Sequence, residues 1–271
     1  MPRILILSSW VAHGHVGLCA AVPALQALGL SAMQVPMCVL SNHPGWPHVA
    51  GRPLPVDQAE AMLQALRANG WLAGCDAVLT GYMPSAEHVA LAAGWAGRLG
   101  ARLVVDPVLG DAPGGLYVPE AVAQAVRAQL LPLADVLTPN TFELGWMAGR
   151  PVTTRAEAAQ AARALPGKPG RTVLLTSAPC TPGRTGVLQL GGDAGDGAAW
   201  SAPLRSGVPH GVGDVFSALI AAGLPAGAAL GHLDALIGAS LAAPHLRIAE
   251  TARAWTTAAP LPPEPERSHG L

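Results

Sequence analysis

Short runs of consecutive apolar residues recur along the chain, separated by polar or glycine-rich segments. The first run, Ile4-Leu5-Ile6-Leu7, ends in two serines, and similar runs follow further along the chain. Runs of this kind are typical of strands that are buried on both faces of a parallel sheet. The pattern predicts strands over residues 3–8, 32–40, 75–79, 102–105, 135–137 and 172–176.

Between these runs, apolar residues recur at helical spacing, and start and stop signals frame several segments. Ser85 is placed to cap one helix at its N-terminus, and Pro119 lies in the first turn of another. Gly29 directly follows the first predicted helix, where glycine commonly ends a helix. The predicted helices cover residues 16–28, 56–68, 85–99, 119–130, 141–147, 154–165, 213–222 and 226–243.

The alternation of strands and helices predicts an α/β fold around a mainly parallel sheet. Two later segments, 187–190 and 198–203, are predicted to form an antiparallel pair around Gly191-Gly192. No shift in composition marks a domain boundary, so we expect a single domain over residues 1–258. The end of the chain, 259–271, is rich in proline and charge and is expected to be a flexible tail.

The composition narrows the class of protein further. Of 271 residues, 51% are apolar and 12% are charged, as in a folded chain. The net charge of −1 gives no basic surface for nucleic acid, so no nucleic-acid partner is expected. No apolar stretch is long enough for a membrane span or an export signal, and the four cysteines are widely scattered. We therefore expect a cytoplasmic protein without a membrane partner.

Polar side chains follow several predicted strands, at the point where each strand ends. Asp106 follows the strand over 102–105, with Asp111 just beyond it, and Glu143 lies one turn after Asn140. Ligands of parallel sheets bind beyond the carboxyl ends of the strands, so these acids are expected to converge. Acids gathered at one edge suit a Mg²⁺ ion held through water beside phosphates. Any one of them alone is equally explained as a helix cap or a loop acid.

A second signal is the sequence Gly211-Val212-Gly213-Asp214, which opens an apolar helix. Glycines ahead of a helix let backbone N–H groups point at an anion, and the helix dipole favours negative charge there. A carboxylate at this place would repel phosphate, so Asp214 makes sense as a base that takes a proton from an attacking hydroxyl. Taken alone, Asp214 is more simply a helix cap, and the acid cluster is what gives the motif weight.

Neither G-x-x-x-x-G-K-[ST] nor G-x-G-x-x-G occurs, which excludes a P-loop or protein-kinase type of nucleotide site. The segments that do occur resemble those of pyridoxal kinases, within the ribokinase-like superfamily. The resemblance runs from about Ile4 to Ala222. The segments that carry it are Ser9 with Gly14-His15-Val16-Gly17, Ser41-Asn42-His43, Leu79-Thr80-Gly81-Tyr82, Asp106-Pro107-Val108-Leu109-Gly110-Asp111, Tyr117-Val118-Pro119, Ala134-Asp135, Thr138-Pro139-Asn140 with Glu143, Thr176-Ser177 and Gly211-Val212-Gly213-Asp214.

The resemblance implies a ribokinase-like three-layer α/β/α fold. It also implies phosphoryl transfer from ATP to the 5′-hydroxyl of pyridoxal, with pyridoxine and pyridoxamine as further substrates, in B6 salvage. Asp214 would be the base, and Gly211, Val212 and Gly213 would form the anion hole. The remaining implied residues are Ser9, Val16, His43 and Tyr82 for the vitamer; Asp106, Thr138, Asn140, Thr176, Ser177 and Tyr117 for ATP; and Asp111 and Glu143 for the metal.

The resemblance also implies a homodimer that needs Mg²⁺ and often K⁺. The chain departs from the family pattern at Pro44, where such kinases usually carry threonine, and at Trp10, where histidine is common. These departures leave two alternatives open. One is a hydroxymethylpyrimidine kinase of the same superfamily, and the other is a protein that binds a B6 vitamer without catalysis.

Overall fold

The computed structural model describes residues 2–192 and 197–265, and within them most strands join one nine-stranded sheet. The strands of this sheet are β1 (Ile4–Val11), β2 (Ala32–Leu40), β3 (Gly51–Pro53), β4 (Ala77–Thr80), β5 (Arg102–Val105), β8 (Val136–Leu137), β9 (Thr172–Thr176), β10 (Arg184–Gly191) and β11 (Ala199–Pro203). Their order is β11-β10-β9-β8-β5-β4-β1-β2-β3. A separate hairpin pairs β6 (Gly110–Asp111) with β7 (Gly115–Leu116).

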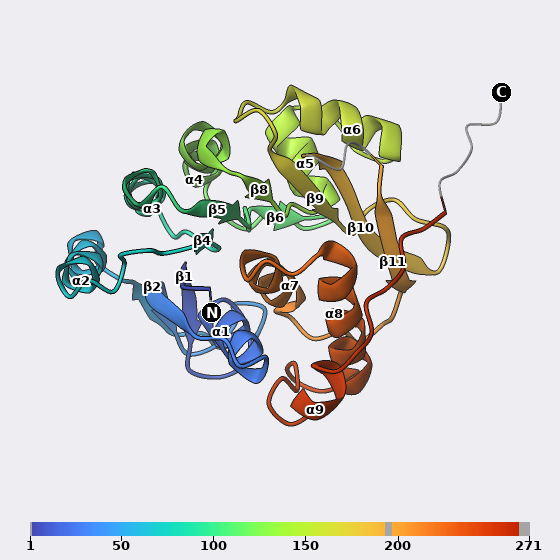
Figure 1. Ribbon diagram of the computed structural model, residues 1–271, viewed down its shortest axis with the longest axis horizontal. Coiled ribbons are helices and arrows are strands. Elements are labelled where there is room, and N and C mark those ends of the chain that lie inside the picture. The colour runs from blue at the N-terminus through green and yellow to red at the C-terminus, as the bar shows by residue number, and fades with distance from the viewer. Residues whose placement is uncertain (1, 193–196, 266–271) are drawn as a thin grey trace.

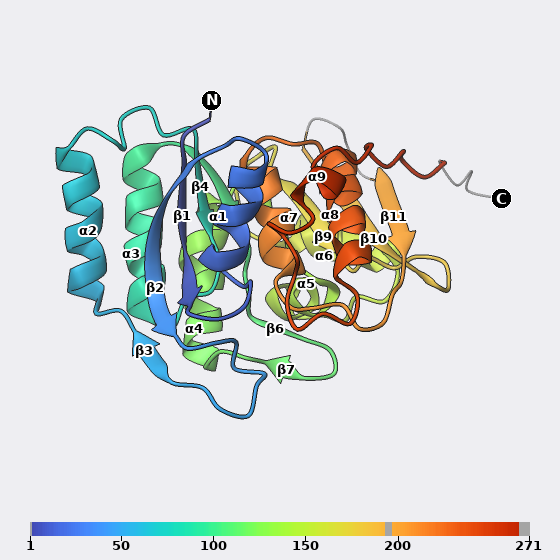
Figure 2. The same cartoon turned by 90° about the horizontal axis from the view of Figure 1, so that it is seen from below.

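The sheet is mainly parallel. The strands from β2 through β1, β4, β5 and β8 to β9 run in one direction, whereas β3 and β10 are antiparallel to their neighbours. The carboxyl ends of the parallel strands therefore meet at one edge, the lower edge in Figure 2, where β3 and the β6–β7 hairpin also lie. The expected α/β fold is confirmed, and so is the antiparallel pairing of β10 with β11.

Helices cover both faces of the sheet, because the side chains of its central strands alternate between two cores. Leu5 and Leu7 of β1 enter one core, and Ile4 and Ile6 enter the other. The first core faces α2 to α6 and the second faces α1, α7, α8 and α9, so the molecule has three layers (Figure 1). The helices are α1 (Leu18–Ala27), α2 (Val56–Ala68), α3 (Ala86–Leu99), α4 (Glu120–Ala125), α5 (Thr141–Ala148), α6 (Arg155–Ala164), α7 (Val212–Ala221), α8 (Ala226–Ser240) and α9 (Ala252–Trp255).

Most predicted elements are found, and the differences have local causes. Strand β1 continues past the predicted end at residue 8, because a bulge between Ser8 and Ser9 lets it keep pairing with β2. The predicted helix over 119–130 is α-helical only in α4 and continues as a π-helical segment, Val126–Leu130. Helix α8 ends earlier than predicted, at Ser240, whose hydroxyl donates to the Leu236 carbonyl oxygen and accepts the Arg247 N–H.

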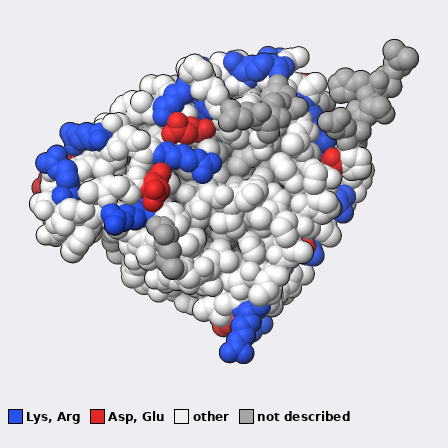
Figure 3. Space-filling view, in the orientation of Figure 1, with Lys and Arg blue, Asp and Glu red and all other residues white. Residues whose placement is uncertain are grey.

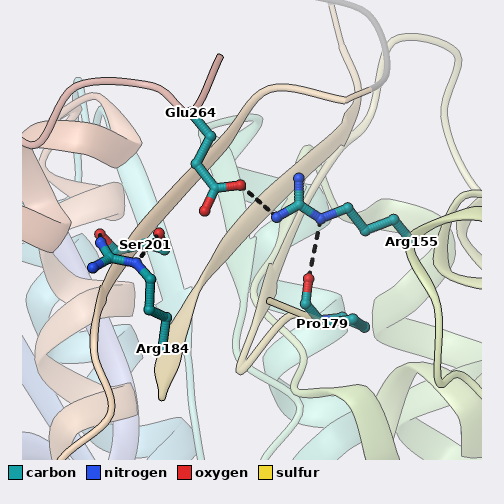
Figure 4. Close-up of polar contacts among 5 residues, drawn as sticks. All are labelled: Arg155, Pro179, Arg184, Ser201 and Glu264. Carbon is teal, nitrogen blue, oxygen red and sulfur yellow. Dashed lines mark hydrogen bonds and ion pairs between the residues drawn. The ribbon is translucent and has the colours of Figure 1, made fainter. Parts of the chain in front are cut away.

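The segment expected to begin a flexible tail is held against the body as far as Glu264. The N–H of Leu261 donates to the carbonyl oxygen of Gly227 over 2.9 Å, and the N–H of Glu264 donates to Ala199 over 2.7 Å. Glu264 also forms an ion pair with Arg155 of α6 at 2.6 Å, close to the Pro179 carbonyl that Arg155 contacts (Figure 4). Residues 266–271 of the expected tail lie outside the described residues.

Charged side chains are few on the face seen in Figure 3, and those of opposite sign lie next to one another. Lys168, the single lysine of the sequence, forms an ion pair with Asp135 at 2.7 Å. No helix within residues 2–192 and 197–265 is long and apolar enough to cross a membrane.

Candidate active site

The loop ahead of α7 packs against the turn that follows β1. Gly211 caps α7 with a φ of 96°, a left-handed conformation that glycine adopts without strain. A Cβ atom at Gly211 would lie 1.9 Å from the carbonyl oxygen of His15, so a side chain is excluded there. The first N–H groups of a helix have no partner within it. The loop over Gly211, Val212 and Gly213 therefore leads into a helix start whose N–H groups lack intrahelical partners, and such groups can bind an anion.

Asp214 lies in the first turn of α7, directly behind this loop. Burial raises the pKa of its carboxyl to about 6, although a hydrogen bond from the Gly17 backbone lowers it. A carboxyl with this pKa is mostly ionised at neutral pH and is still basic enough to accept a proton. The role of Asp214 as a general base remains the prediction made from the sequence.

Three hydroxyl and carboxyl groups from different elements form a buried chain beside Asp214. The Ser217 hydroxyl donates to Asp106 Oδ2 over 2.8 Å and lies 2.8 Å from the Thr138 hydroxyl. Burial, followed by the charges of Glu143 and Asp214, raises the pKa of Asp106. Helix α7 is thus bonded to the ends of β5 and β8, and three acids share one small region.

Glu143 and Asn140 form a capping box at the start of α5. The Asn140 side chain accepts the Glu143 N–H at 2.9 Å, and Glu143 Oε2 accepts the Asn140 N–H at 2.8 Å. Glu143 Oε1 accepts the N–H of Leu109 at 2.8 Å, next to Val108, whose φ is 45°. A β-branched residue is strained in that conformation, so Glu143 holds the loop after Asp106 in an unfavourable shape.

The β6–β7 hairpin brings two further predicted residues to the site. Burial raises the pKa of the Tyr117 hydroxyl, and a hydrogen bond to Asp111 raises it further. Asp111 is exposed, and so is Tyr117 at 56%. The charge of Asp111 also acts on Glu143, for which burial raises the pKa to about 7. The hairpin therefore borders the acid cluster and leaves Asp111 open to solvent.

The predicted vitamer residues gather at the ends of β1, β2 and β4. Ser9 is opposite Cys38 in the β1–β2 register, and Tyr82 is close enough to Cys38 for the thiol to raise its pKa, after burial. Val16 and His43 line one small cavity of about 20 Å³. Ser9 also lies against the turn after β1, because a Cβ atom at Gly17 would be 2.3 Å from the Ser9 hydroxyl oxygen.

A larger cavity of about 320 Å³ opens on the other side of the anion loop, and no sequence pattern predicts it. Its walls come from the segment after β11, including Leu204 and Val208, and from Ile237 of α8. Leu204 is 63% exposed, so the cavity offers an open apolar surface. The loop residues Gly211, Val212 and Gly213 form its floor.

Two predicted nucleotide residues lie at the end of β9, Thr176 as its last residue and Ser177 directly after it. The Thr176 hydroxyl donates to the Pro139 carbonyl oxygen at 3.2 Å. Ser177 is exposed and adopts a φ of 50°, so its side chain is free of the sheet. Neither residue lines the larger cavity. Sequence reasoning missed Ser217, although a hydroxyl one turn after Asp214 in an otherwise apolar helix was a usable signal.

The acid cluster fits a divalent cation only in part. Both carboxylate oxygens of Glu143 accept hydrogen bonds from backbone N–H groups, and one oxygen of Asp106 accepts a hydrogen bond from the Ser217 hydroxyl. In the described part of the chain, no group of three or more His, Cys, Asp or Glu is arranged to enclose a metal ion. Mg²⁺ commonly uses one or two carboxylates together with water and substrate phosphates, and Asp106, Asp111 and Glu143 match that use.

Comparison with known proteins agrees with this geometry. Residues 12–235 match the family described as phosphomethylpyrimidine kinase. The chain belongs to this family. The pyridoxine/pyridoxal/pyridoxamine kinase of Bordetella avium (strain 197N) is 40% identical over 235 residues, which cover 84% of this chain and 79% of that protein. The pyridoxal kinase of Homo sapiens is 33% identical over 239 residues, which cover 81% of this chain and 74% of that protein.

The solved structures of the family support the same assignment. Pyridoxal kinase from Leishmania donovani in complex with ADP and pyridoxamine has a TM-score of 0.84 and 30% identity. The alignment covers 98% of this chain and 100% of that one. Both the expected resemblance to pyridoxal kinases and the ribokinase-like fold are therefore confirmed.

Proposed function

We propose that the protein transfers a phosphoryl group from ATP to the 5′-hydroxyl of pyridoxal, and likewise acts on pyridoxine and pyridoxamine, in B6 salvage. The observation that carries the proposal is the position of Asp214. It is a carboxyl of raised pKa at the N-terminus of α7, behind a loop that glycines hold open for an anion. The named activities of the relatives agree with it.

The reaction follows from these positions. The 5′-hydroxyl oxygen attacks the γ-phosphorus, and Asp214 takes the hydroxyl proton. The bond from the γ-phosphorus to the β,γ-bridging oxygen breaks, and ADP leaves with that electron pair. The N–H groups over Gly211, Val212 and Gly213 stabilise the charge on the phosphoryl oxygens. Burial of Asp214 keeps its proton affinity high enough for this role.

The two cavities on either side of the anion loop suggest where each substrate binds. The vitamer ring belongs with Ser9, Val16, His43 and Tyr82, near the turn that contacts Asp214 through Gly17. The adenine ring fits the apolar cavity at Leu204, Val208 and Ile237, whose volume of about 320 Å³ is in the range of ligand pockets. The phosphates then reach the residues that follow the strands. These are Asp106, Thr138, Asn140, Thr176, Ser177 and Tyr117.

Thr138 and Asn140 would shape the nucleotide site without touching the nucleotide, because their side chains are hydrogen-bonded to other residues of the protein. Asp111 and Glu143 are the proposed metal residues, with Glu143 acting through water because its oxygens are engaged. When bound, Mg²⁺ supplies positive charge beside the phosphates. The charge of the buried acids Asp106 and Glu143, together with that of the half-buried Asp214, favours a cation there. K⁺ is proposed as an accessory cation.

The test is an ATP-dependent assay with pyridoxal, read by absorbance of the phosphorylated product, with Mg²⁺ and K⁺ omitted in turn. Asp214→Asn is expected to lower turnover by about 10²- to 10⁴-fold while pyridoxal still binds. Asp57→Asn is the matched control, because Asp57 lies in the first turn of α2, away from the site. Near-normal turnover of the Asp214 variant would remove the assignment of the base.

The same assay separates the alternatives. The family description favours a second candidate, phosphorylation of hydroxymethylpyrimidine, so both alcohols are compared with one preparation. A higher kcat/KM for hydroxymethylpyrimidine would replace the proposed substrate. Tight binding of pyridoxal phosphate without ATP consumption would indicate a binding protein instead.

We also propose a cytoplasmic homodimer. Trp10 and Val39 are opposite each other in the β1–β2 register, and each is 38% exposed, which leaves an apolar surface on adjacent strands. All four cysteines are free thiols, as expected in a reducing compartment. Light scattering after size exclusion is expected to give twice the chain mass, and Trp10→Glu to give a monomer.

A further inference from the structure

Two histidines from distant segments stack at the entrance to the site. The rings of His43 and His210 have centroids 4.0 Å apart and planes inclined by 21°. His43 belongs to the loop after β2, whereas His210 directly precedes Gly211 of the anion loop. The stack therefore joins the vitamer side of the site to the loop that faces the phosphoryl group.

The hydrogen bonds of the two rings show which of their nitrogens are engaged within the protein. His43 Nδ1 accepts the N–H of Gly45 at 3.0 Å, so the proton of the neutral ring is on Nε2. Burial lowers the pKa of His43, and the neighbouring His210 lowers it further. For His210 no hydrogen bond to another described residue is found, although its ring packs over Gly45. At least one N–H of His210 is consequently available to a ligand.

The backbone around Gly211 fixes the position of His210 and therefore where its ring N–H can bind a ligand. Gly211 is pinned against the His15 carbonyl, so the residue before it cannot move away from the anion loop. His210 lines the small cavity with Val16 and His43, and it also lines the large cavity that suits the nucleotide. It is therefore the residue at the boundary where a phosphoryl group passes from one side to the other.

The charged residues near the large cavity give a second argument that His210 contacts phosphate. The large cavity contains one arginine, Arg205, and its guanidinium is bonded to the carboxylate and the carbonyl oxygen of Asp234. The single lysine, Lys168, is paired with Asp135. The described residues that line this cavity therefore offer a phosphate chain no unpaired lysine or arginine, and the acids Asp106, Glu143 and Asp214 would repel it. An imidazole N–H without a partner among the described residues supplies a hydrogen-bond donor that phosphate can use.

We propose that His210 is a catalytic residue that donates an N–H hydrogen bond to the γ-phosphoryl group of ATP and to the same group once it is on the vitamer. The inference rests on the proposed function. His210 gives up no proton in the step: the hydroxyl proton goes to Asp214, and ADP leaves with the electron pair of the broken bond. His43 positions His210 by stacking against it.

The experiment compares two nucleotides on the unmodified protein and on His210→Val. The first is ADP, and the second is an ATP analogue with nitrogen between the β and γ phosphates, both with the same Mg²⁺ concentration. The variant is expected to bind the analogue about 10-fold more weakly and to bind ADP unchanged, because only the analogue carries a γ-phosphoryl group. Affinity for pyridoxal 5′-phosphate should also fall about 10-fold, whereas affinity for pyridoxal should not.

His210→Gln keeps an N–H donor and is expected to recover most of the loss. His48→Gln is the matched control, because it removes an exposed histidine of the His43 loop that lines neither cavity. Equal loss of ADP and analogue, or no loss of either, would overturn the role of His210. If the unmodified protein binds neither nucleotide, the proposed function itself fails, and this outcome is distinct from failure of His210 alone.

Discussion

Ser217 and Asp106 are joined by a hydrogen bond of 2.8 Å between helix α7 and the end of strand β5. Ser217 is 1% exposed, so water does not replace its hydroxyl. The bond orients the Asp106 carboxylate. Its donor, Ser217, lies one helical turn after Asp214 in α7. It also gives the helix that carries the base a fixed attachment to the sheet.

Ser217→Ala is expected to lower both stability and turnover. Removal of the hydroxyl leaves one oxygen of the buried Asp106 carboxylate without its Ser217 donor, although the Val108 backbone still donates to this carboxylate, and the loss costs about 1–3 kcal/mol of unfolding free energy. We expect turnover to fall about 10-fold, because the carboxylate is no longer oriented. Urea unfolding and the kinase assay measure the two effects. Ser240→Ala removes a buried hydroxyl that lines neither cavity and should lower stability alone, and an equal fall in its turnover would contradict a positioning role for Ser217.

The pH dependence follows from Asp214. Because the pKa of this carboxyl is raised to about 6, it is protonated below that pH and cannot accept the hydroxyl proton. A plot of kcat/KM for pyridoxal against pH is expected to fall on the acid side with a midpoint near 6. An acid limb centred near 4, the usual range of an exposed aspartate, would show that Asp214 is not the base.

The free energy of unfolding should fall as the pH rises, whereas kcat/KM should rise with pH over the same range. The folded protein holds a proton on Asp214 in the window from the ordinary aspartate value of 3.8 up to about 6, whereas the unfolded chain has released it. The free energy of unfolding therefore falls as the pH rises through this window. Asp214→Asn is expected to be more stable than the unmodified chain at pH 8, by about 1–3 kcal/mol. Thermal unfolding of both proteins at pH 4 and pH 8 measures the effect.

Gly211→Ala tests the shape of the anion loop. The new methyl group would clash with the His15 carbonyl in a left-handed conformation, so the loop must shift. We expect turnover to fall by at least about 10²-fold, in line with the loss of an oxyanion-type donor. Gly29→Ala is the control, because Gly29 has φ 76° but nothing within 4 Å of an added Cβ. It should cost about 1 kcal/mol of stability and leave turnover unchanged.

Arg155→Ala tests the attachment of the chain end. Its guanidinium bonds Glu264 and the Pro179 carbonyl, and its side chain is 29% exposed. We expect a loss of about 1 kcal/mol in unfolding free energy, which is near the upper value for partly exposed pairs. Arg98→Ala breaks a looser pair with Glu60 at 3.7 Å and 56% exposure, and should change stability less. A larger effect of Arg98→Ala would contradict the importance of the attachment.

Local patterns predicted the elements that local interactions determine. The bounds of α2 were predicted residue for residue, and Ser85 caps α3 as expected, because both depend on neighbours within a few residues. Elements without a pattern of their own were missed, namely β3, the β6–β7 hairpin and α9. Each is four residues long or shorter, too short for a period to be recognised.

The candidate site was predictable as a set of strand ends but not as a set of contacts. Because ligands bind at the carboxyl ends of parallel strands, the sequence predicts that Asp106, Asp111 and Glu143 converge. The pairing of Ser217 with Thr138, and of His43 with His210, joins segments far apart in the chain. Such pairs depend on the packing of α7 and of two loops against the sheet, which the sequence pattern does not encode.

The turn between β1 and α1 is attached to the start of α7 at two points. Its Gly17 N–H donates to the carboxyl of Asp214, and its His15 carbonyl lies against Gly211. If the proposed roles hold, the turn beside the vitamer and the loop beside the phosphoryl group would move together. A substrate that fits badly against the turn would then displace Asp214 as well, so discrimination between alcohols would act on the chemical step in addition to binding strength.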